Sequence, residues 1–254
     1  MSFGSLNLLL RSHVTPAVVA RYWSGRMSRA WRRAFPDAAR ERRIAEARRA
    51  FEARASGGAF SNTWFDGGIE LWERLLAPMK AQGRPLELLE VGSWEGRSSL
   101  FLLGYLPTAT LTAVDTWEGG DEHREDPELA LLEQRFDHNL AAFRSRLAKL
   151  KGRSSTVLPA LAAERKECFD FIYIDGSHFA DDVMLDAVLA WQLLRVDGIL
   201  VFDDYLWRYA PYGRKRNPAA AINLFLRLVG RDSRLLHVGH QLALRKTQSL
   251  MRYT

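Results

Sequence analysis

Two apolar runs that each stop at an aspartate constrain this chain more than any other feature. Residues 169–174 end at Asp175, and residues 198–202 end at the pair Asp203-Asp204. A helix-length segment joins the runs, and continuous apolar runs are typical of strands buried in a parallel sheet. The carboxyl ends of such strands meet at one crevice, where ligands bind. We therefore expect three carboxylates and His178 to meet at this crevice.

The chain from residue 86 onward alternates strand-like and helix-like segments. Strands are predicted at 86–91, 110–115, 154–158, 169–175 and 198–203. Helices are predicted at 97–105, 127–150, 180–195 and 218–229. This alternation predicts a doubly wound α/β sheet. The tail from Leu235 to Thr247 contains no crossover helix, and we expect one or two strands there that close the edge of the sheet.

The N-terminal part is expected to be a separate helical extension over residues 1–56, followed by one domain over residues 57–254. Helices are predicted at 17–35 and 38–55. The extension carries twelve arginines against four acidic residues, so it holds more than the whole net charge of +6. Such an arm suits nucleic acid or anionic lipid. The simpler interpretation, which we favour, is a solvated helix whose arginine stems lie on apolar surface.

Composition limits the compartment and excludes a membrane span. Cys168 is the single cysteine of the sequence, which excludes an internal disulfide and suits a reducing cytoplasm. No apolar run approaches ~18 residues, the length that a membrane span requires. The apolar stretch from Leu6 to Leu10 is too short for the core of a signal peptide.

Residues 88–99 predict a strand, a glycine turn and the start of a helix. Glycine lets a ligand approach the backbone closely, and Ser98 offers a hydroxyl and an N–H at the helix start. The dinucleotide fingerprint fails, because Trp94 and Arg97 occupy its second and third glycine positions. A turn of this kind suits a nucleoside ligand without a pyrophosphate.

Asp115 ends the next predicted strand, at a place where an acidic residue commonly accepts hydrogen bonds from a ribose diol. The alternative role for Asp115 is a simple loop or cap residue. Trp117 lies just beyond it and is a candidate to stack on an adenine; a purely structural role for this ring stays open.

These motifs together resemble the class I S-adenosylmethionine-dependent methyltransferases, most of all the branch that includes macrocin O-methyltransferase. The resemblance covers residues 58–247 and rests on an ordered set of motifs: Glu90-x-Gly92-x3-Gly96, Asp115, Asp175-Gly176-Ser177-His178 and Asp203-Asp204. It implies a seven-stranded, mainly parallel Rossmann-like sheet with an antiparallel C-terminal edge. It also implies that four residues line the methionine part of S-adenosylmethionine, namely Glu90, Gly92, Ser93 and Gly96, and that Asp115 holds the ribose.

The carboxylates Asp175, Asp203 and Asp204 predict a magnesium-type site. They supply only oxygen, which Mg²⁺ prefers, and no cysteine or histidine pair indicates zinc. Neighbouring strand residues point to opposite faces, so Asp203 and Asp204 share a metal only if the backbone turns there. Metal-dependent relatives carry acids at these three places. The alternative is that one of the pair caps a loop.

His178 is the predicted general base, and Asp175 is assigned with it to the catalytic residues and also to the cofactor site. A bound divalent ion lowers the pKa of a substrate hydroxyl, and a nearby base then takes the proton. The alternative is a histidine that only orients Asp175 or the cofactor carboxylate. The remaining histidines are expected at the surface or at strand edges: His13, His123, His138, His237 and His240.

The resemblance favours a metal-dependent O-methyltransferase that acts on a small hydroxylated molecule or a sugar. The aromatic and basic segment 205–216 directly after the acidic pair suits such a substrate, or is a solvated loop. An RNA-directed methyltransferase that uses the basic arm is one alternative, but nucleic acid is disfavoured because the main domain is slightly acidic. A non-catalytic binding module of the same fold is another. A homo-oligomer through the arm stays open.

Overall fold

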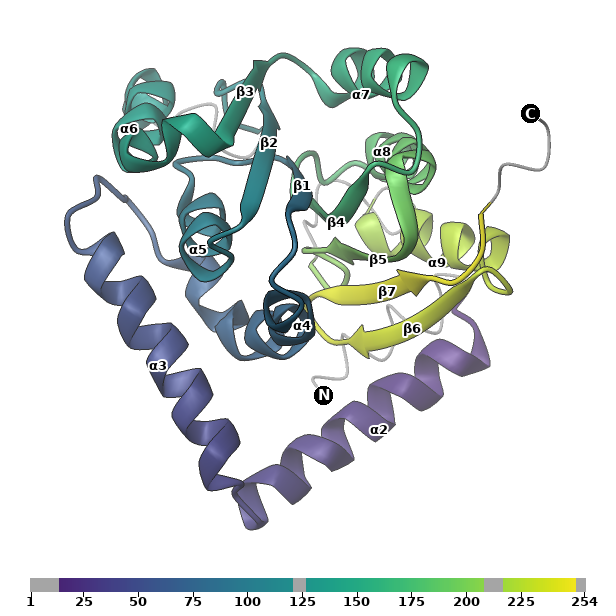
Figure 1. Ribbon diagram of the computed structural model, residues 1–254. Helices are drawn as coiled ribbons and strands as arrows, with labels where there is room; N and C mark the ends of the chain where they lie inside the picture. Colours follow the sequence, from purple (N-terminus) through teal and green to yellow (C-terminus); the bar gives the residue numbers. More distant parts are fainter. Residues whose placement is uncertain (1–13, 121–126, 208–216, 250–254) are drawn as a thin grey trace. The chain divides into compact units, whose positions relative to one another are not determined.

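The computed structural model describes residues 14–120, 127–207 and 217–249 (Figure 1). It divides into two compact units, Phe35–Arg153 and Met1–Ala34 with Ser154–Thr254. The boundary expected near residue 56 stays a prediction about the domains. No described helix is at once long and apolar enough to cross a membrane.

Seven strands form one sheet in the order β3-β2-β1-β4-β5-β7-β6. Their bounds are β1 Leu86–Val91, β2 Ala109–Asp115, β3 Leu147–Lys151, β4 Phe169–Ile174, β5 Leu194–Phe202, β6 Ser233–Val238 and β7 Leu242–Lys246. The pairs β1–β2, β2–β3 and β4–β5 are parallel, whereas β7 pairs antiparallel with both β5 and β6. The predicted fold class, a mainly parallel sheet with an antiparallel C-terminal edge, is confirmed.

The unit of residues 35–153 is built on an aromatic core. Its helices are α3 Ala38–Ala55, η1 Trp64–Gly68, α4 Ile69–Ala81, α5 Arg97–Tyr105, η3 Pro127–Leu131, α6 Leu132–Asn139 and η4 Ala141–Arg146. Phe51 of α3, Phe65 of η1 and Phe101 of α5 pack edge-on or tilted, with ring centroids 5.3–5.7 Å apart. Trp72 of α4 lies 4.8 Å from Phe65 in the same cluster. Helices α3 and α4 each bury apolar residues on one side, as helical periodicity requires.

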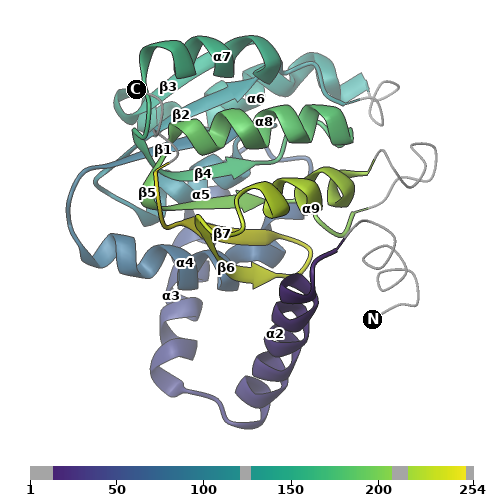
Figure 2. The same ribbon diagram turned by 90° about the vertical axis from the view of Figure 1, so that its right-hand side faces the viewer.

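The second unit carries the helices α2 Pro16–Ala34, α7 Ser154–Glu164, α8 Ala180–Leu193 and α9 Pro218–Leu228. In Figure 2, α7, α8 and α9 lie side by side, and α8 contacts both of the others. All six residues of β4 are buried, as its continuous apolar run predicts. Helix α2 contacts β6 at the edge of the sheet.

One strand was predicted in the wrong place. Residues 154–158 begin α7, and the third strand lies at Leu147–Lys151, inside the segment predicted as a helix over 127–150. That segment is divided into η3, α6, η4 and β3. The spacing of Leu140, Phe143, Leu147 and Leu150 imitates a helical period. Strand β3 lies at the edge of the sheet with no fully buried residue, so it lacks the clear alternation by which strands are recognised.

Candidate functional site

The turn between β1 and α5 is as tight as its glycines predict. Gly92 and Gly96 adopt φ values of 83° and 79°, and Trp94 between them adopts 49°. A Cβ atom at Gly96 would lie 2.3 Å from Cδ2 of Leu140. Both the left-handed backbone and the close neighbour therefore require glycine at position 96.

Gly96→Ala is expected to lower the free energy of unfolding by about 2–4 kcal/mol, from backbone strain and overpacking together. Urea denaturation followed by circular dichroism measures this loss. Gly57→Ala is the matched control, because a Cβ at Gly57 meets nothing within 4 Å. Equal stability of the two variants would show that the turn relaxes at little cost.

Asp115 accepts three backbone hydrogen bonds at the end of β2. One oxygen accepts from the N–H groups of Ser93 and Trp94 at 2.6 and 2.9 Å, and the other accepts from Trp117 N–H at 2.7 Å. The carboxylate thus holds the glycine turn, which matches the loop role considered from the sequence. A carboxylate has about four lone-pair sites, so acceptance from a ribose diol stays a prediction.

Trp117 is only 4% exposed. Its Nε1–H donates to the Trp94 carbonyl at 3.0 Å, and its ring lies 4.8 Å from that of Phe136 and 4.6 Å from the Lys149 ammonium. These contacts give the ring a structural role. Stacking on an adenine stays a prediction that this packing does not favour.

Glu90 lies at the end of β1 with no exposed surface. Burial raises the pKa of its carboxyl to about 7, although the hydroxyls of Ser98 and Ser99 lower it. The Ser99 hydroxyl donates to Oε2, whereas Oε1 makes no hydrogen bond within the described residues. A buried carboxylate oxygen without a partner suits a cationic group such as the ammonium of a methionine moiety.

Glu90→Gln is expected to change how stability depends on pH. The pKa is higher in the folded than in the unfolded state, so wild-type stability is complete below the unfolded value of 4.5 and falls as pH rises through about 7. Between about pH 5 and about pH 8.5, wild type should lose about 2–3 kcal/mol relative to the variant. Urea denaturation of both proteins across that range measures the difference, and parallel curves would contradict the shifted pKa.

A second group of side chains gathers where β4 and β5 end. The hydroxyl oxygen of Tyr173 on β4 lies 2.9 Å from Oδ2 of Asp175 and 2.7 Å from Oδ1 of Asp203, so its single proton can be donated to either carboxylate. The amide of Gln241 also donates to Oδ1 of Asp203. The turn before β7 thus supplies a residue that the sequence analysis did not identify.

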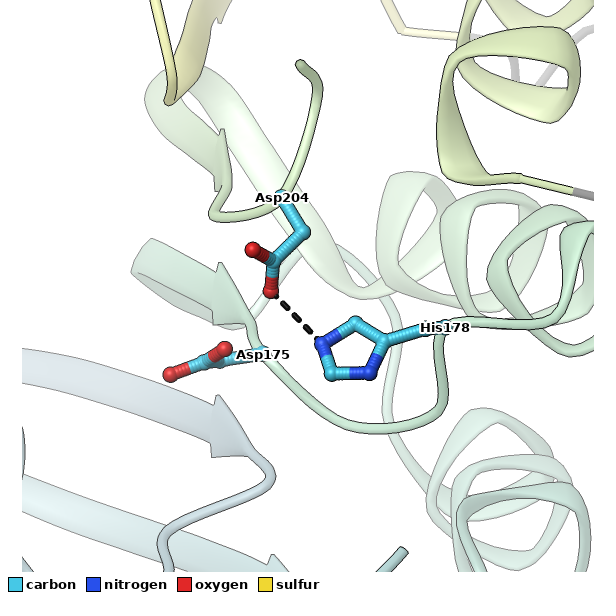
Figure 3. Close-up of side chains that lie close together, drawn as sticks. All are labelled: Asp175, His178 and Asp204. Carbon is cyan, nitrogen blue, oxygen red and sulfur yellow. Dashed lines mark hydrogen bonds and ion pairs between the residues drawn. The ribbon is translucent and has the colours of Figure 1, made fainter. Parts of the chain in front are cut away.

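Asp204 is the centre of this acidic cluster. Nε2 of His178 lies 2.8 Å from its Oδ2 (Figure 3), and Nε2 of His240 lies 3.4 Å from its Oδ1. Ligand atoms of Asp175, His178 and Asp204 all lie within 4.8 Å of one another, and those of Asp203, Asp204 and His240 do likewise. His240 was expected only at a strand edge, and its contact with Asp204 was not predicted.

The surroundings of the cluster shift the pKa values of Asp203 and Asp204 in opposite directions. Burial and the neighbouring charge of Asp204 raise the pKa of Asp203. Burial also opposes ionisation of Asp204, but hydrogen bonds from His178 and His240 lower its pKa to about 2. The hydrogen bond to Asp204 raises the pKa of His240. Adjacent acids with opposite shifts are typical of functional sites.

The donor set fits a hard divalent cation. Three carboxylates stand at the ends of two neighbouring strands, and the repulsion between Asp203 and Asp204 is what a cation would relieve. Strand β5 ends at Phe202 and the backbone bends at Asp203, whose N–H still donates to the Ile174 carbonyl at 3.0 Å. The two ligand groups above include His178 or His240 beside the acids, so the predicted triad of Asp175, Asp203 and Asp204 stays a prediction about the ligands.

Aromatic residues near both groups differ in exposure. Phe65 is part of the aromatic core, whereas Trp64 is 67% exposed and lies 5.7 Å from Trp94. Trp207 stacks on His178 with ring centroids 4.2 Å apart. Most of the substrate segment predicted at 205–216 lies outside the described residues.

Comparisons with known proteins support the fold and match part of the chain to a domain family. Residues 89–205 match a family model described as a methyltransferase domain. No curated protein matches the chain. Among solved structures, the MycE methyltransferase from the mycinamycin biosynthetic pathway, in complex with Mg and SAH, matches with a TM-score of 0.55 and 15% identity over 84% of this chain.

This chain spans 56% of the length of MycE. A second MycE structure, with Mg, SAH and mycinamycin VI, matches with a TM-score of 0.54, 16% identity and the same shares of both chains. The O-methyltransferase TomG from Streptomyces achromogenes, involved in tomaymycin synthesis and in complex with SAM, matches with a TM-score of 0.53 and 16% identity over 81% of this chain and 89% of its own. Residues 89–205 are therefore similar to a methyltransferase domain, and the chain shares the fold of the MycE and TomG methyltransferases.

Proposed function

We propose that this methyltransferase moves the methyl group of S-adenosylmethionine to a hydroxyl of a small molecule or sugar, with the help of a divalent cation such as Mg²⁺. The observation that carries the proposal is the cluster of Asp175, Asp203 and Asp204 with His178 at the ends of β4 and β5. MycE, which has a similar fold, was solved with Mg, SAH and mycinamycin VI.

The donor is assigned to the turn after β1. The buried carboxylate of Glu90, with its unpartnered Oε1, suits the methionine ammonium. Gly92, Ser93 and Gly96 would let the methionine part lie against the backbone, and Ser98 stands in the first turn of α5. Asp115 would accept from the ribose diol as the resemblance implies.

The cation is assigned to Asp175, Asp203 and Asp204, with His178 and His240 as the nearby nitrogen donors. When bound, a divalent cation supplies positive charge that favours the ionised form of a substrate hydroxyl. Three carboxylates on two adjacent strand ends are a rigid support for such a charge. The raised pKa of Asp203 also means that cation binding displaces a proton there at low pH.

His178 is assigned as the base. Asp204 has a low pKa and is ionised, so its carboxylate can only accept a hydrogen bond from His178. Nε2 of His178 is therefore the ring nitrogen that carries a hydrogen. Nδ1 is then the ring nitrogen that takes the hydroxyl proton. The substrate oxygen bonds to the methyl carbon, the carbon–sulfur bond breaks, and its electron pair leaves on the sulfur of S-adenosylhomocysteine.

Isothermal titration calorimetry with S-adenosylmethionine and S-adenosylhomocysteine, with and without Mg²⁺, tests the proposal. A radiolabelled methyl donor then tests transfer to a panel of catechols and hydroxylated glycosides. We expect binding of both nucleosides and chelator-sensitive transfer. Donor binding with transfer only to RNA would favour the RNA-directed alternative, and absence of donor binding would favour a non-catalytic module.

A further inference from the structure

Helix α2 presents an apolar stripe to solvent. Trp23, Met27 and Trp31 recur every four residues and therefore share one side of the helix. They are 47%, 71% and 65% exposed. Single exposed apolar residues are common on protein surfaces, but three large ones in a row form a patch of the kind that marks an interaction site.

The side of α2 that packs on the protein is a different one. Val18 and Tyr22 are only 1% and 5% exposed, and the guanidinium of Arg21 donates to the Leu236 carbonyl of β6 at 3.1 Å. At 100° per residue, the mean direction of Val18 and Tyr22 lies about 160° from the exposed stripe. The first half of α2 is thus held against β6 (Figure 2), and the apolar side points away from that strand.

The charge of α2 has one sign. The helix contains five arginines and no acidic residue: Arg21, Arg26, Arg29, Arg32 and Arg33. No acidic residue precedes Asp37 anywhere in the sequence. On the helical wheel the arginines lie outside the stripe, whose gaps are filled by Ala30 and Ala34. The helix therefore combines an exposed apolar side rich in tryptophan with charged residues that are all cationic.

Charge decides which partner suits this surface. A second copy of α2 laid along the stripe would set five arginines against five, with no acid on either helix to pair with them. A single-stranded nucleic acid could stack on the tryptophans and pair with the arginines. It would gain nothing, however, from the methionine and alanine side chains that complete the apolar side. An anionic bilayer surface accepts both the apolar stripe and the positive charge.

We propose that α2 binds the surface of membranes that contain anionic lipid. Trp23, Met27 and Trp31 enter the boundary between headgroups and acyl chains, and the arginines nearest the stripe, such as Arg26 and Arg33, contact the lipid phosphates. The helix lies in the plane of the interface and does not cross the bilayer, which agrees with its composition. The enzyme would then work at the membrane surface, where amphiphilic hydroxylated acceptors concentrate.

Vesicle flotation of the full chain tests this proposal. The vesicles are phosphatidylcholine alone, or equal parts of phosphatidylcholine and phosphatidylglycerol. We expect binding to the anionic vesicles only, weakened when salt rises from about 50 mM to about 500 mM because screening shortens the reach of the arginines. Failure to bind the anionic vesicles at low salt overturns the proposal.

Two variants separate the apolar and the charged contributions. Replacing Trp23, Met27 and Trp31 together by serine should weaken binding roughly tenfold or more, since each buried side chain contributes substantially. Arg26→Gln with Arg33→Gln, the two arginines that lie nearest one border of the stripe, should weaken it roughly fivefold per residue. The matched control is Leu224→Ser with Leu228→Ser on α9, which removes two equally exposed apolar residues, 46% and 67% exposed, from a different helix.

Circular dichroism and donor binding check that every variant is folded. Loss of vesicle binding in the stripe variant but not in the α9 control supports the proposal. Equal loss in both, or none in the stripe variant, overturns it. It is also overturned if wild type sediments as a dimer that the stripe variant dissociates while neither binds vesicles, because the stripe then faces a second copy.

Discussion

Asp204→Asn should abolish high-affinity cation binding. Asp204 is the one residue common to both ligand groups, with His178 in one and His240 in the other. The substitution removes a negative charge and the acceptor for both histidines, but it keeps the shape of the side chain. We expect the affinity for Mn²⁺, a paramagnetic substitute for Mg²⁺, to fall by about 100-fold or more, beyond the roughly 10–100-fold typical of outer-shell losses. Electron paramagnetic resonance of free Mn²⁺ measures this directly.

Asp197→Asn is the matched control for Asp204→Asn. Asp197 lies on the same strand β5 but is exposed near the opposite end, and its φ of 67° is tolerated by asparagine. The control should bind Mn²⁺ as wild type does. If both variants bind Mn²⁺ equally, the carboxylates at the end of β5 do not form the metal site, and the metal-dependent part of the proposed function is lost.

Donor binding distinguishes loss of metal from loss of fold. Apart from Asp175, the residues assigned to the donor lie between Glu90 and Trp117, whereas Asp204 contacts His178 and His240 outside that segment. Affinity for S-adenosylhomocysteine should therefore stay within a few-fold of wild type in Asp204→Asn. A parallel loss of both affinities would indicate a folding defect.

Much of the sheet is readable from the sequence because buried parallel strands leave an unbroken apolar signal. β4 and β5 were predicted from such runs, and the aspartates at their ends followed from where the runs stop. β3 left no such signal, because an edge strand with leucines at helical spacing looks like a helix. Local pattern therefore predicts central strands better than edges.

The candidate site was likewise predicted only in part. Asp175, His178 and Asp204 were identified because each stands beside a strand end in the sequence, and the structure brings them together. His240 and Gln241 were missed, because only the antiparallel register of β5 and β7, with Phe202 opposite Leu242, places that turn beside the acidic pair. The register of a long-range strand pair is not visible in one sequence.

Asp115 illustrates a subtler limit. Its place at a strand end was predicted, but its three hydrogen bonds to the backbone of the neighbouring turn and loop were not. Those partners are N–H groups, which every residue carries, so no side-chain motif reveals them. A strand-end acid can hold a turn and a ligand at once, and only a ligand complex separates the two roles.

His178→Gln should slow methyl transfer by about 100-fold to 10,000-fold if His178 is the general base. In the wild type, Nε2 of His178 lies 2.8 Å from Oδ2 of Asp204. A glutamine amide can donate the same hydrogen bond to Asp204, but it accepts no proton at neutral pH. The variant therefore keeps the geometry of the cluster and removes only the acid–base function. Single-turnover transfer of a radiolabelled methyl group to an acceptor from the catechol and glycoside panel measures the chemical step.

The same variant decides between the two roles that the sequence left open for His178. If the histidine only orients its neighbours, glutamine should support transfer within about tenfold of wild type, whereas His178→Ala should not, because alanine leaves Asp204 without that donor. If it is the base, both variants should be equally slow while Mn²⁺ and donor affinities stay close to wild type. His237→Gln on β6 is the matched control and should transfer at the wild-type rate. Near-equal rates for wild type and both His178 variants would assign the proton to another acceptor, and the acidic cluster would then act through charge alone.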